Sequence, residues 1–415
     1  MTVAPARLSA NHWPGLDVVP SGPRSKVSAR IARRLFITAI NRLDVTVLAG
    51  DERWGRGGPV AVVHRPEEFF ARLGRHQLIG FGEAYLTGAW DAEDVSGFLQ
   101  VLAAEMATLV PEPLQRFRAV VAKRQPRRQK SSAKNSRANI AHHYDLSNEL
   151  FQLFLDPTLS YSSALFDGDP ATATASDLEA AQGRKIERLL DEAGVGPGSR
   201  VLEIGSGWGE LCIRAARRGA TITSLTLSVE QKALADERIA AAGYSEQCSV
   251  EICDYREVSG SYDAVVSVEM IEAVGFDYWT TYFETIDRVL APGGKVAIQA
   301  ITMPHDRMLV TRNTYTWIHK YIFPGGFLPS VRVIDEITRE HTSLRMAPAF
   351  AMGQHYAQTL RLWDEAFLAH QSEVVGLGFD ETFLRMWHFY LEYSRSGFAS
   401  GYIDVNQLTF ARDLP

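Results

Sequence analysis

The chain has 415 residues, 46% hydrophobic and 22% charged, which is the composition of a soluble globular protein of two or three domains. Its net charge of −6 excludes a general attraction to nucleic acid or anionic membranes, so any such attraction has to be local. The three cysteines fit neither a metal-ligand spacing nor a disulfide framework and indicate a reducing compartment. With no apolar run of the roughly 18–20 residues that span a membrane and no signal-peptide core, we expect a cytoplasmic protein whose membrane contact is peripheral.

The first part of the chain predicts a small α+β domain behind a leader. Residues 1–28 are rich in Pro, Gly and Ser and are expected to form a flexible leader. Residues 29–118 mix short strands, at 45–48 and 60–63, with helical stretches such as 95–109. We therefore expect residues 29–118 to form a separate N-terminal domain.

A block of positive charge follows this domain. Residues 115–144 contain nine Lys or Arg and no acid, and 119–137 have the character of a linker. Three interpretations stay open: a solvated tether, a patch at 116–137 facing anionic lipid headgroups, and nucleic-acid binding. No nucleic-acid motif accompanies the charges, so we expect a membrane surface rather than nucleic acid as the partner.

Strands and helices alternate from residue 178 onward, which predicts a parallel, doubly wound sheet in a domain covering 138–415. The expected helices are 178–193, 208–218, 229–242 and 278–290. The expected strands are 200–204, 221–226, 249–252, 263–268 and 295–300, the last one following a turn at "APGG" (291–294).

A glycine cluster, "RVLEIGSGWGELC", joins the first of these strands to a helix. Gly205, Gly207 and Gly209 let the backbone turn tightly and let a ligand approach closely. An acid, Glu203, lies two residues before the first glycine, which strengthens the signal for a nucleotide-type cofactor. The alternative is that the glycines only form a tight strand–helix turn and bind no ligand.

The spacing of this loop favours S-adenosylmethionine (SAM) over a dinucleotide. It is G-x-G-x-G, and the next strand end offers Thr226 and Gln231 but no acid for ribose hydroxyls. Asp254, after the third strand, is suitably placed to accept a hydrogen bond from an adenine amino group. The fold class expected is therefore a Rossmann-like class I SAM-methyltransferase with a smaller N-terminal α+β domain.

Two acids, Glu269 and Glu272, stand where the apolar strand 262–268 should end. They could lie in a solvated loop or the first turn of a helix, or they could line a pocket that holds a cation. No metal spacing accompanies them, and no metal is expected.

Several motifs of the chain resemble the cyclopropane-fatty-acyl-phospholipid synthase and mycolic acid methyltransferase family. In the catalytic part they are "AHHYDLSNELFQLFLDPTLSYSSALF" (141–166), "KYIFPGGFLPS" (320–330), "HYAQTLRLW" (355–363) and "GYIDVNQ" (401–407), and "GEAYLTGAWD" (82–91) extends the resemblance to the N-terminal domain. The resemblance implies a SAM-dependent enzyme that acts on the double bond of an unsaturated phospholipid acyl chain. It also makes a homodimer an expectation.

The resemblance assigns residues to the cofactor and to a bicarbonate ion that serves as base in the family. Those implied around SAM are Ser160, Tyr161 and Ser162 at its methionine end and Gly205, Gly207, Thr226, Gln231, Asp254 and Tyr255 elsewhere. The bicarbonate ligands map to Ser163 (Cys in the family), Glu272, Gln299 (His in the family), Ile301 and Tyr356. The glycine of the family's "SxGxFEH" motif is Glu269 here, so two ligands have changed and a carboxylate has been gained.

These departures lead to a hypothesis about the product. Methyl transfer to an alkene leaves a carbocation, which needs a dry pocket, π density and a base. The aromatic wall is expected from Tyr161, Phe166, Tyr315, Trp317, Tyr321, Phe323 and Tyr356. We expect Glu269 to be the base and the product to be a methylene-branched (10-methylene, 10-methyl precursor) chain, which a separate reductase could saturate. Cyclopropane formation with bicarbonate and a non-catalytic SAM- or lipid-binding protein stay open as alternatives.

Overall fold

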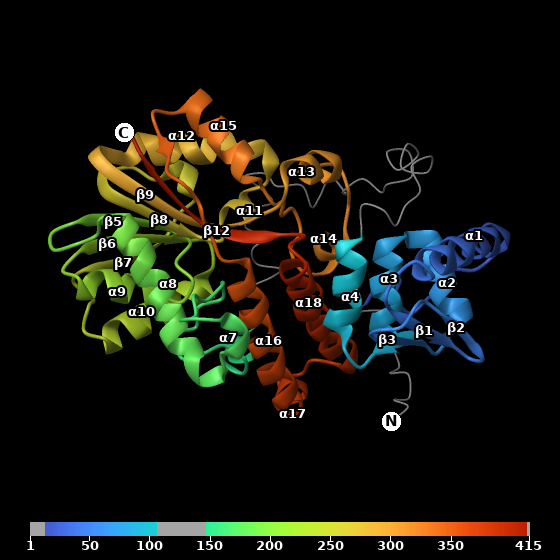
Figure 1. Cartoon of the computed structure of the whole chain (residues 1–415). Coiled ribbons are helices and arrows are strands. Elements are labelled where there is room, and N and C mark those ends of the chain that lie inside the picture. The colour runs from blue at the N-terminus through green and yellow to red at the C-terminus, as the bar shows by residue number, and fades with distance from the viewer. Residues whose placement is uncertain (1–12, 106–146, 413–415) are drawn as a thin grey trace. The chain divides into compact units, whose positions relative to one another are not determined.

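The computed structural model describes residues 13–105 and 147–412 (Figure 1). The basic segment 116–137 therefore lies outside the described residues, as does the start of the leader. The chain divides into two compact units, the first made of Met1–Lys123, Tyr315–Ile322 and Asp364–Tyr402 and the second of Arg124–Thr314, Phe323–Trp363 and Ile403–Pro415. This division differs from the contiguous boundaries 29–118 and 138–415, because two late segments belong to the first unit.

The first unit combines a small sheet with helices. Its strands are β1 (Thr46–Ala49), β2 (Glu52–Trp54), β3 (Val60–Val63) and β4 (Trp90–Ala92), in the order β2-β1-β3-β4. Its helices are α1 (Pro23–Ile40), α2 (Pro66–His76), α3 (Leu78–Leu86), α4 (Val95–Ala104), α14 (Trp317–Tyr321), α17 (Gln371–Gly376) and α18 (Glu381–Ala399); α16 (Gly353–Ala369) contributes to both units. Helix α1 begins at Pro23, so the end of the expected leader is helical.

A buried acid fastens the segment of α14 to α3 within this unit. Glu83, 1% exposed, accepts hydrogen bonds from Tyr321 Oη (3.2 Å) and contacts His76 Nδ1 (2.7 Å) and Lys320 Nζ. Burial opposes ionisation, but His76 and Lys320 together lower the pKa of Glu83 to about 2. The ionised Glu83 side chain thus helps to hold the first unit together.

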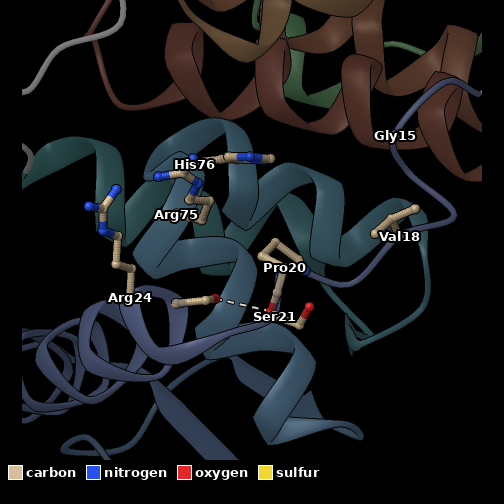
Figure 2. A pocket seen from close by; sticks show the side chains of 8 residues that line it. Gly15, Val18, Pro20, Ser21, Arg24, Arg75 and His76 are labelled. Carbon is tan, nitrogen blue, oxygen red and sulfur yellow. Dashed lines mark hydrogen bonds between the residues drawn. The ribbon is translucent and has the colours of Figure 1, made fainter.

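A pocket with a cavity volume of about 420 Å³ lies beside the start of α1 (Figure 2). It is lined by Gly15, Val18, Pro20, Ser21, Arg24, Ser25, Arg75 and His76. Ser25, 6% exposed, donates a hydrogen bond to the carbonyl of Pro20 (3.0 Å), which holds the preceding segment against the helix.

The second unit is built on a mostly parallel sheet. Its strand order is β10-β12-β9-β8-β5-β6-β7, with β11 also paired to β12. The strands from β7 to β9 are parallel, and β12 is antiparallel to β9. The predicted doubly wound α/β fold is confirmed.

The observed boundaries stay close to those expected from the sequence. The strands are β5 (Arg200–Ile204), β6 (Thr221–Thr226), β7 (Cys248–Ile252), β8 (Tyr262–Val268), β9 (Leu290–Thr302), β10 (Arg345–Met346), β11 (Phe350–Ala351) and β12 (Asp404–Ala411). The helices are α7 (Asn148–Gln152), α8 (Leu178–Glu192), α9 (Glu210–Arg217), α10 (Val229–Ala241), α11 (Ile271–Val274), α12 (Trp279–Val289), α13 (His305–Thr311) and α15 (Val331–His341), with short 3-10 turns at Pro170–Thr172, Ala175–Asp177, Tyr255–Glu257 and Phe276–Tyr278.

Two expected boundaries need correction. The turn predicted at "APGG" lies inside β9, where Leu290 pairs with Tyr262 and Lys295 already pairs with Ala264, so the intervening residues bulge from the ladder. Helix α9 begins at Glu210 rather than residue 208, because Gly209 adopts a left-handed conformation (φ 87°).

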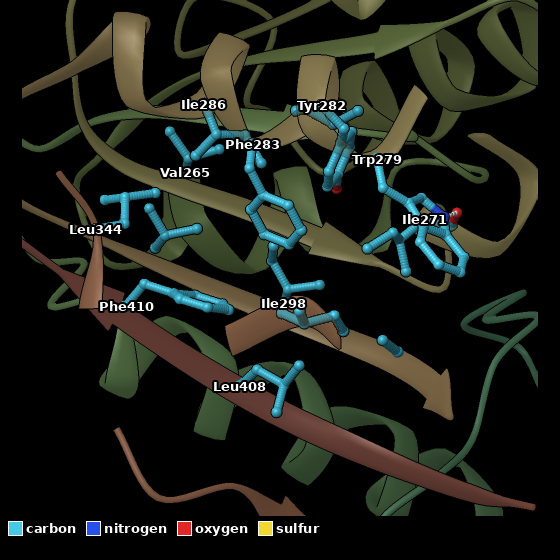
Figure 3. Close-up of a cluster of buried hydrophobic side chains, with 14 of the residues drawn as sticks. Val265, Ile271, Trp279, Tyr282, Phe283, Ile286, Ile298, Leu344, Leu408 and Phe410 are labelled. Atoms are coloured by element: carbon cyan, nitrogen blue, oxygen red, sulfur yellow. Dashed lines mark hydrogen bonds between the residues drawn. The ribbon is translucent and has the colours of Figure 1, made fainter. Parts of the chain in front are cut away.

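Helices cover both faces of this sheet, and each face has its own core. On one face α12 packs Trp279, Tyr282 and Phe283, each 0% exposed, against β5, β8 and β9 (Figure 3). On the other face α8, α9 and α10 pack against alternate residues of the same strands. Burial on both faces explains the nearly continuous apolar runs of the central strands.

The parallel strands bring their carboxyl ends to one edge of the sheet. Gly205 N donates to Leu225 O (3.0 Å), and Glu269 N donates to Gln299 O (2.7 Å). Segments that follow β5, β6, β7 and β8 therefore meet along this edge, which is where ligands bind in open α/β sheets.

Candidate active site

The site begins with the glycine loop after β5. Gly205 has a φ of 97°, and a Cβ there would come within 2.4 Å of Met270 Cγ, so only glycine fits. Gly207 (φ 48°) faces open space, with no atom within 4 Å of the place a Cβ would take. The loop thus leaves backbone accessible to a ligand at Gly207.

Thr226 and Gln231 meet at the end of β6. Thr226 Oγ1 lies 3.2 Å from Gln231 Oε1 and accepts a hydrogen bond from Ser228 N (3.1 Å). Both side chains are buried, at 6% exposure. The structure therefore brings this expected pair together beside the glycine loop.

The two expected residues after β7 have different surroundings. The carboxylate of Asp254 forms an ion pair with Arg256 (2.5 Å) and caps a 3-10 turn. Tyr255 packs edge-on against Tyr282 (ring centroids 5.4 Å apart), and its buried hydroxyl has no hydrogen-bond partner among the described residues. The Asp254 carboxylate is thus already ion-paired where the sequence assigned it to an adenine amino group.

Glu203 lies in the interior rather than beside the loop. It is 3% exposed and accepts hydrogen bonds from Ser224 Oγ (2.6 Å) and Cys212 Sγ (3.3 Å). Burial raises the pKa of Glu203 to about 7. The carboxylate therefore bridges β6 and α9 and does not line the glycine loop.

The segment 160–163 is held by helix α8. Gln182 Nε2 donates to the carbonyls of Ser160 (3.2 Å) and Ser162 (2.8 Å), and Lys185 Nζ lies 2.5 Å from Ser162 Oγ. Gln182 Oε1 is buried and has no partner among the described residues. Sequence reasoning missed Gln182 and Lys185, whose signal was a pair of polar residues three apart on the buried face of an amphipathic helix.

The centre of the site is the carboxylate of Glu269, on which three donors converge. Oε1 accepts from Ser163 N (2.9 Å) and Gln299 Nε2 (2.8 Å), and Oε2 accepts from Tyr356 Oη (2.8 Å). These three residues occupy the changed and retained positions that the sequence assigned to bicarbonate. Glu269 itself has a φ of 53°, a left-handed conformation that costs a non-glycine residue about 1–2 kcal/mol.

A second layer of hydrogen bonds orients the Gln299 amide. Gln407 Nε2 donates to Gln299 Oε1 (3.1 Å), and Arg188 Nη1 donates to Gln407 Oε1 (2.7 Å). Gln299 is 0% and Gln407 2% exposed. Because Gln299 Oε1 accepts from Gln407, its NH₂ group is the end that faces Glu269.

Glu272 differs from Glu269 in its partners. Its Oε1 accepts a hydrogen bond from Ile301 N, so the structure joins these two predicted residues. Its Oε2 is buried and has no partner among the described residues. Burial, with the nearby charge of Glu269, raises the pKa of Glu272 to about 8.

Burial and neighbouring charges shift the pKa values of the ionisable groups in this region. Burial raises the pKa of Glu269, although Lys185 and its three hydrogen bonds favour the ionised form. Burial also lowers the pKa of Lys185, 1% exposed, to about 8. Lys185 therefore compensates the charge of Glu269, and a sulfonium beside the unpartnered Glu272 Oε2 would favour the ionised form of Glu272.

Aromatic rings stand beside this cluster. Tyr161 stacks on Trp363 (centroids 5.3 Å apart, 27°), and Tyr356 meets the same ring edge-on (6.1 Å, 88°). Trp363 was not singled out from the sequence, and Phe166 stacks on His355 instead. Tyr315, Trp317 and Tyr321, expected in the wall, belong to the first unit, whereas Phe323 belongs to the second.

The site fits SAM. The open face at Gly207, the Thr226–Gln231 pair and the unpartnered Glu272 Oε2 offer respectively space, polar contacts and an anionic partner for a sulfonium. Among the described residues, no group of three or more His, Cys, Asp or Glu is placed to hold a metal ion.

Comparisons with known proteins identify relatives of the whole chain. The chain is 51% identical, over 99% of its length and 97% of the relative's, to "Tuberculostearic acid methyltransferase UfaA1" of Mycobacterium tuberculosis (strain ATCC 25618 / H37Rv). It is 32% identical to "Cyclopropane-fatty-acyl-phospholipid synthase" of Escherichia coli (strain K12), over 86% of this chain and 89% of the relative.

Solved structures give the same result for the fold. The cyclopropane synthase MmaA2 from Mycobacterium tuberculosis superposes with a TM-score of 0.60 at 31% identity, over 66% of this chain and 98% of that one. The mycolic acid cyclopropane synthase CmaA1, complexed with SAH and CTAB, also has a TM-score of 0.60, at 30% identity, over 69% of this chain and 98% of that one.

A family profile described as mycolic acid cyclopropane synthetase matches residues 131–408. The expected resemblance and the expected cofactor, SAM, are both confirmed. The chain belongs to the mycolic acid cyclopropane synthetase family and is a SAM-dependent methyltransferase.

Proposed function

We propose that this enzyme methylates the double bond of an unsaturated phospholipid acyl chain and releases a methylene-branched chain, with Glu269 as the base. The observation that carries the proposal is the convergence of Ser163, Gln299 and Tyr356 on the Glu269 carboxylate. A fixed carboxylate thus stands where the family's motif implies a bicarbonate ion. The 51% identity to a tuberculostearic acid methyltransferase supports the methylene branch of the family.

SAM, when bound, supplies an electrophilic methyl group, whose transfer to the alkene leaves a positive charge on the acyl chain. The rings of Tyr161, Tyr356 and Trp363 offer π density to that charge and exclude water from it. Glu272, whose Oε1 accepts a hydrogen bond from Ile301 N, adds negative charge when a cation beside it favours its ionised form. Their contacts with one another hold these groups in place, which limits the reorganisation that stabilising the charge requires.

Glu269 completes the reaction by accepting a proton. A hydride shift places the positive charge on the carbon that carries the new methyl group. The methyl C–H bond then breaks, its electron pair forms the exocyclic C=C bond, and the proton goes to a Glu269 oxygen. The raised pKa of Glu269 makes it a better base than an exposed glutamate.

The alternative product is a cyclopropane, formed if the methyl proton is lost without the hydride shift. The Ser163, Gln299 and Tyr356 donors already hold a carboxylate, which leaves less reason for bicarbonate here. Saturation of the methylene needs a hydride donor and is assigned to a separate reductase.

The location of the protein at the inner face of the membrane and its assembly as a homodimer remain predictions. No helix within residues 13–105 and 147–412 combines the length and apolar character that crossing a bilayer requires. The proposed peripheral site at the inner face of the membrane, through the basic segment 116–137, falls outside the described residues. A homodimer is likewise expected only from the family.

The test is fatty-acid analysis of a host that makes oleoyl phospholipids and expresses this chain alone. Mass spectrometry before and after hydrogenation separates a methylene, which takes up hydrogen, from a ring, which resists it. Glu269→Gln should abolish the product while SAM binding persists, with Glu237→Gln, an exposed acid on α10, as the matched control. Undiminished turnover by Glu269→Gln would eliminate Glu269 as the base.

A rescue experiment sharpens the assignment. Glu269→Gly removes the carboxylate, suits the left-handed backbone and leaves the three donors in place. Added formate or bicarbonate should then restore part of the activity in Glu269→Gly but not in Glu269→Gln, whose amide fills the site. Equal behaviour of the two variants would count against a carboxylate at this position.

A further inference from the structure

Helix α1 of the first unit carries an unusual concentration of positive charge. Its sequence, "PRSKVSARIARRLFITAI", contains five basic residues and no acid. The five are Arg24, Lys26, Arg30, Arg33 and Arg34. Among the described residues only Arg33 has an ion-pair partner, Glu52, so four cations of this helix are not neutralised by a salt bridge there.

The same helix exposes a row of aliphatic side chains. Val27 and Ile31 are each 57% exposed and Leu35 is 42% exposed. Their spacing of four residues places them in one stripe. The opposite face is the buried one, where Phe36 packs on Phe69 (centroids 5.2 Å apart), so the stripe points away from the core.

The pocket beside the start of α1 adds a place for an anion. Figure 2 shows Arg24 and Arg75 at its edge, beside His76, which is already paired with Glu83; Val18, in the preceding segment, is 60% exposed. No acid is among the residues that line it. The N-cap of α1, Gly22, provides no side-chain cap, so the positive end of the helix dipole adds to these charges.

We propose that the outer face of α1, together with this pocket, docks the protein on an anionic phospholipid bilayer. The aliphatic stripe enters the headgroup boundary, the cations contact anionic headgroups, and the pocket takes one lipid phosphate. The inference rests on the proposed function, in which the substrate is an acyl chain of a phospholipid.

Charge complementarity selects the bilayer over a second copy of the chain. If the α1 helices of two copies packed against each other, the four cations without a salt bridge on one helix would lie close to the four on the other. Contact between the aliphatic stripes requires this short distance, at which the electrostatic repulsion is unfavourable. An anionic lipid surface satisfies both the apolar and the cationic side chains of this face.

The test is sedimentation of the full-length protein with vesicles of dioleoyl phosphatidylglycerol and phosphatidylcholine at several salt concentrations. Arg30→Gln with Arg34→Gln should weaken binding about 25-fold at low salt, at roughly fivefold per cation, and flatten its salt dependence. Val27→Ser with Ile31→Ser should weaken binding about tenfold and leave the salt dependence unchanged.

Matched controls lie on the second unit. Val229→Ser removes an equally exposed valine (65%), and Arg217→Gln with Lys295→Gln removes two exposed cations. Both controls should bind vesicles as the native protein does. Arg75→Gln tests the pocket and should weaken binding to phosphatidylglycerol vesicles by about fivefold.

Methyl transfer on two forms of one lipid separates this inference from the proposed function. The α1 variants should retain turnover on oleoyl lipid dispersed in detergent and lose it on vesicles. Native-like vesicle binding by both α1 double variants would overturn the docking face, whatever the turnover. Native protein that binds vesicles but turns over neither form would overturn the proposed function instead. If the Val27→Ser, Ile31→Ser double variant changed its oligomeric state but still bound vesicles, the aliphatic stripe would be an interface between two copies of the chain. That result would also refute the inference.

Discussion

The unpartnered oxygen of Glu272 predicts that SAM binding depends on pH in a way that binding of S-adenosylhomocysteine does not. The pKa of Glu272 is raised to about 8 by burial and by the charge of Glu269. A sulfonium cation favours the ionised form of Glu272, whereas the neutral sulfur of S-adenosylhomocysteine has no such preference. The two ligands share the same amino and carboxyl groups, so the ratio of their affinities reports the sulfonium alone.

The magnitude follows from the fraction of Glu272 that is ionised before binding. With a pKa of about 8, that fraction is about 90% at pH 9 and about 3% at pH 6.5. The affinity for SAM relative to S-adenosylhomocysteine should therefore fall about thirtyfold over this range. Isothermal titration of both ligands at several pH values measures the ratio.

Glu272→Gln provides the control, because it keeps the shape of the side chain and cannot ionise. Its affinity ratio should change with pH much less than that of the native protein, and the remaining change should come from Lys185, whose pKa burial lowers to about 8. A ratio that does not change with pH in the native protein, or that changes equally in Glu272→Gln, would refute the reasoning.

Stability offers an independent readout of the same group. The folded pKa of Glu272, about 8, lies above the ordinary value of 4.5, so the folded state binds the proton more tightly than the unfolded state does. The stability of the ligand-free protein should therefore fall as pH rises from about 4.5 to 8. Thermal unfolding of Glu272→Gln should lack this part of the decline.

Three further predictions concern the supporting residues. Glu269→Gly should be more stable than Glu269→Ala by about 1 kcal/mol in chemical denaturation, because only alanine retains the cost of the left-handed backbone; the opposite order would contradict the strain. Gln407→Leu should lower kcat about tenfold with the KM for SAM unchanged, since the Gln299 amide loses the partner that orients it; an unchanged kcat would remove Gln407 from the site. Glu83→Gln should cost about 1–3 kcal/mol of stability because the partly exposed Lys320 and His76 lose the carboxylate that they share, whereas Glu93→Gln, at an exposed position, should be neutral.

The periodicity of the sequence predicted the fold of the second unit well. Alternating apolar runs and amphipathic helices identify a parallel sheet because the strands of such a sheet are buried on both faces. The turn at "APGG" was misplaced because backbone pairing continues on both sides of it, and pairing between strands leaves no mark in the local composition. The segments 315–322 and 364–402 could not be assigned to the first unit for the same reason, since contacts with distant residues decide their membership.

The site was predictable only where a motif marked it. Glu269 and Glu272 stood out because they departed from or retained the pattern of the family. Gln407 lies 108 residues from the Gln299 that it contacts, and nothing in either local sequence shows that they meet. Lys185 looks from the sequence like any polar residue of an amphipathic helix, and only its burial, at 1% exposure, reveals its place beside Glu269.

The conformation of Glu269 bears on why a carboxylate could replace a bound ion at this strand end. A left-handed residue is natural for the glycine that the family's motif has here, and glutamate bears a cost of about 1–2 kcal/mol to adopt it. A tethered base, however, needs no binding step, and correct placement of a reacting group can be worth about 7–11 kcal/mol of barrier. The free-energy cost of the left-handed backbone is therefore small compared with the lowering of the barrier that correct placement can give. Because three hydrogen bonds fix the carboxylate, the base cannot shift to follow the charge along the acyl chain. Both products lose a proton of the transferred methyl group, so a fixed carboxylate reaches the same proton in either case. The methylene forms when the hydride shift precedes this proton loss, and the ring forms when it does not.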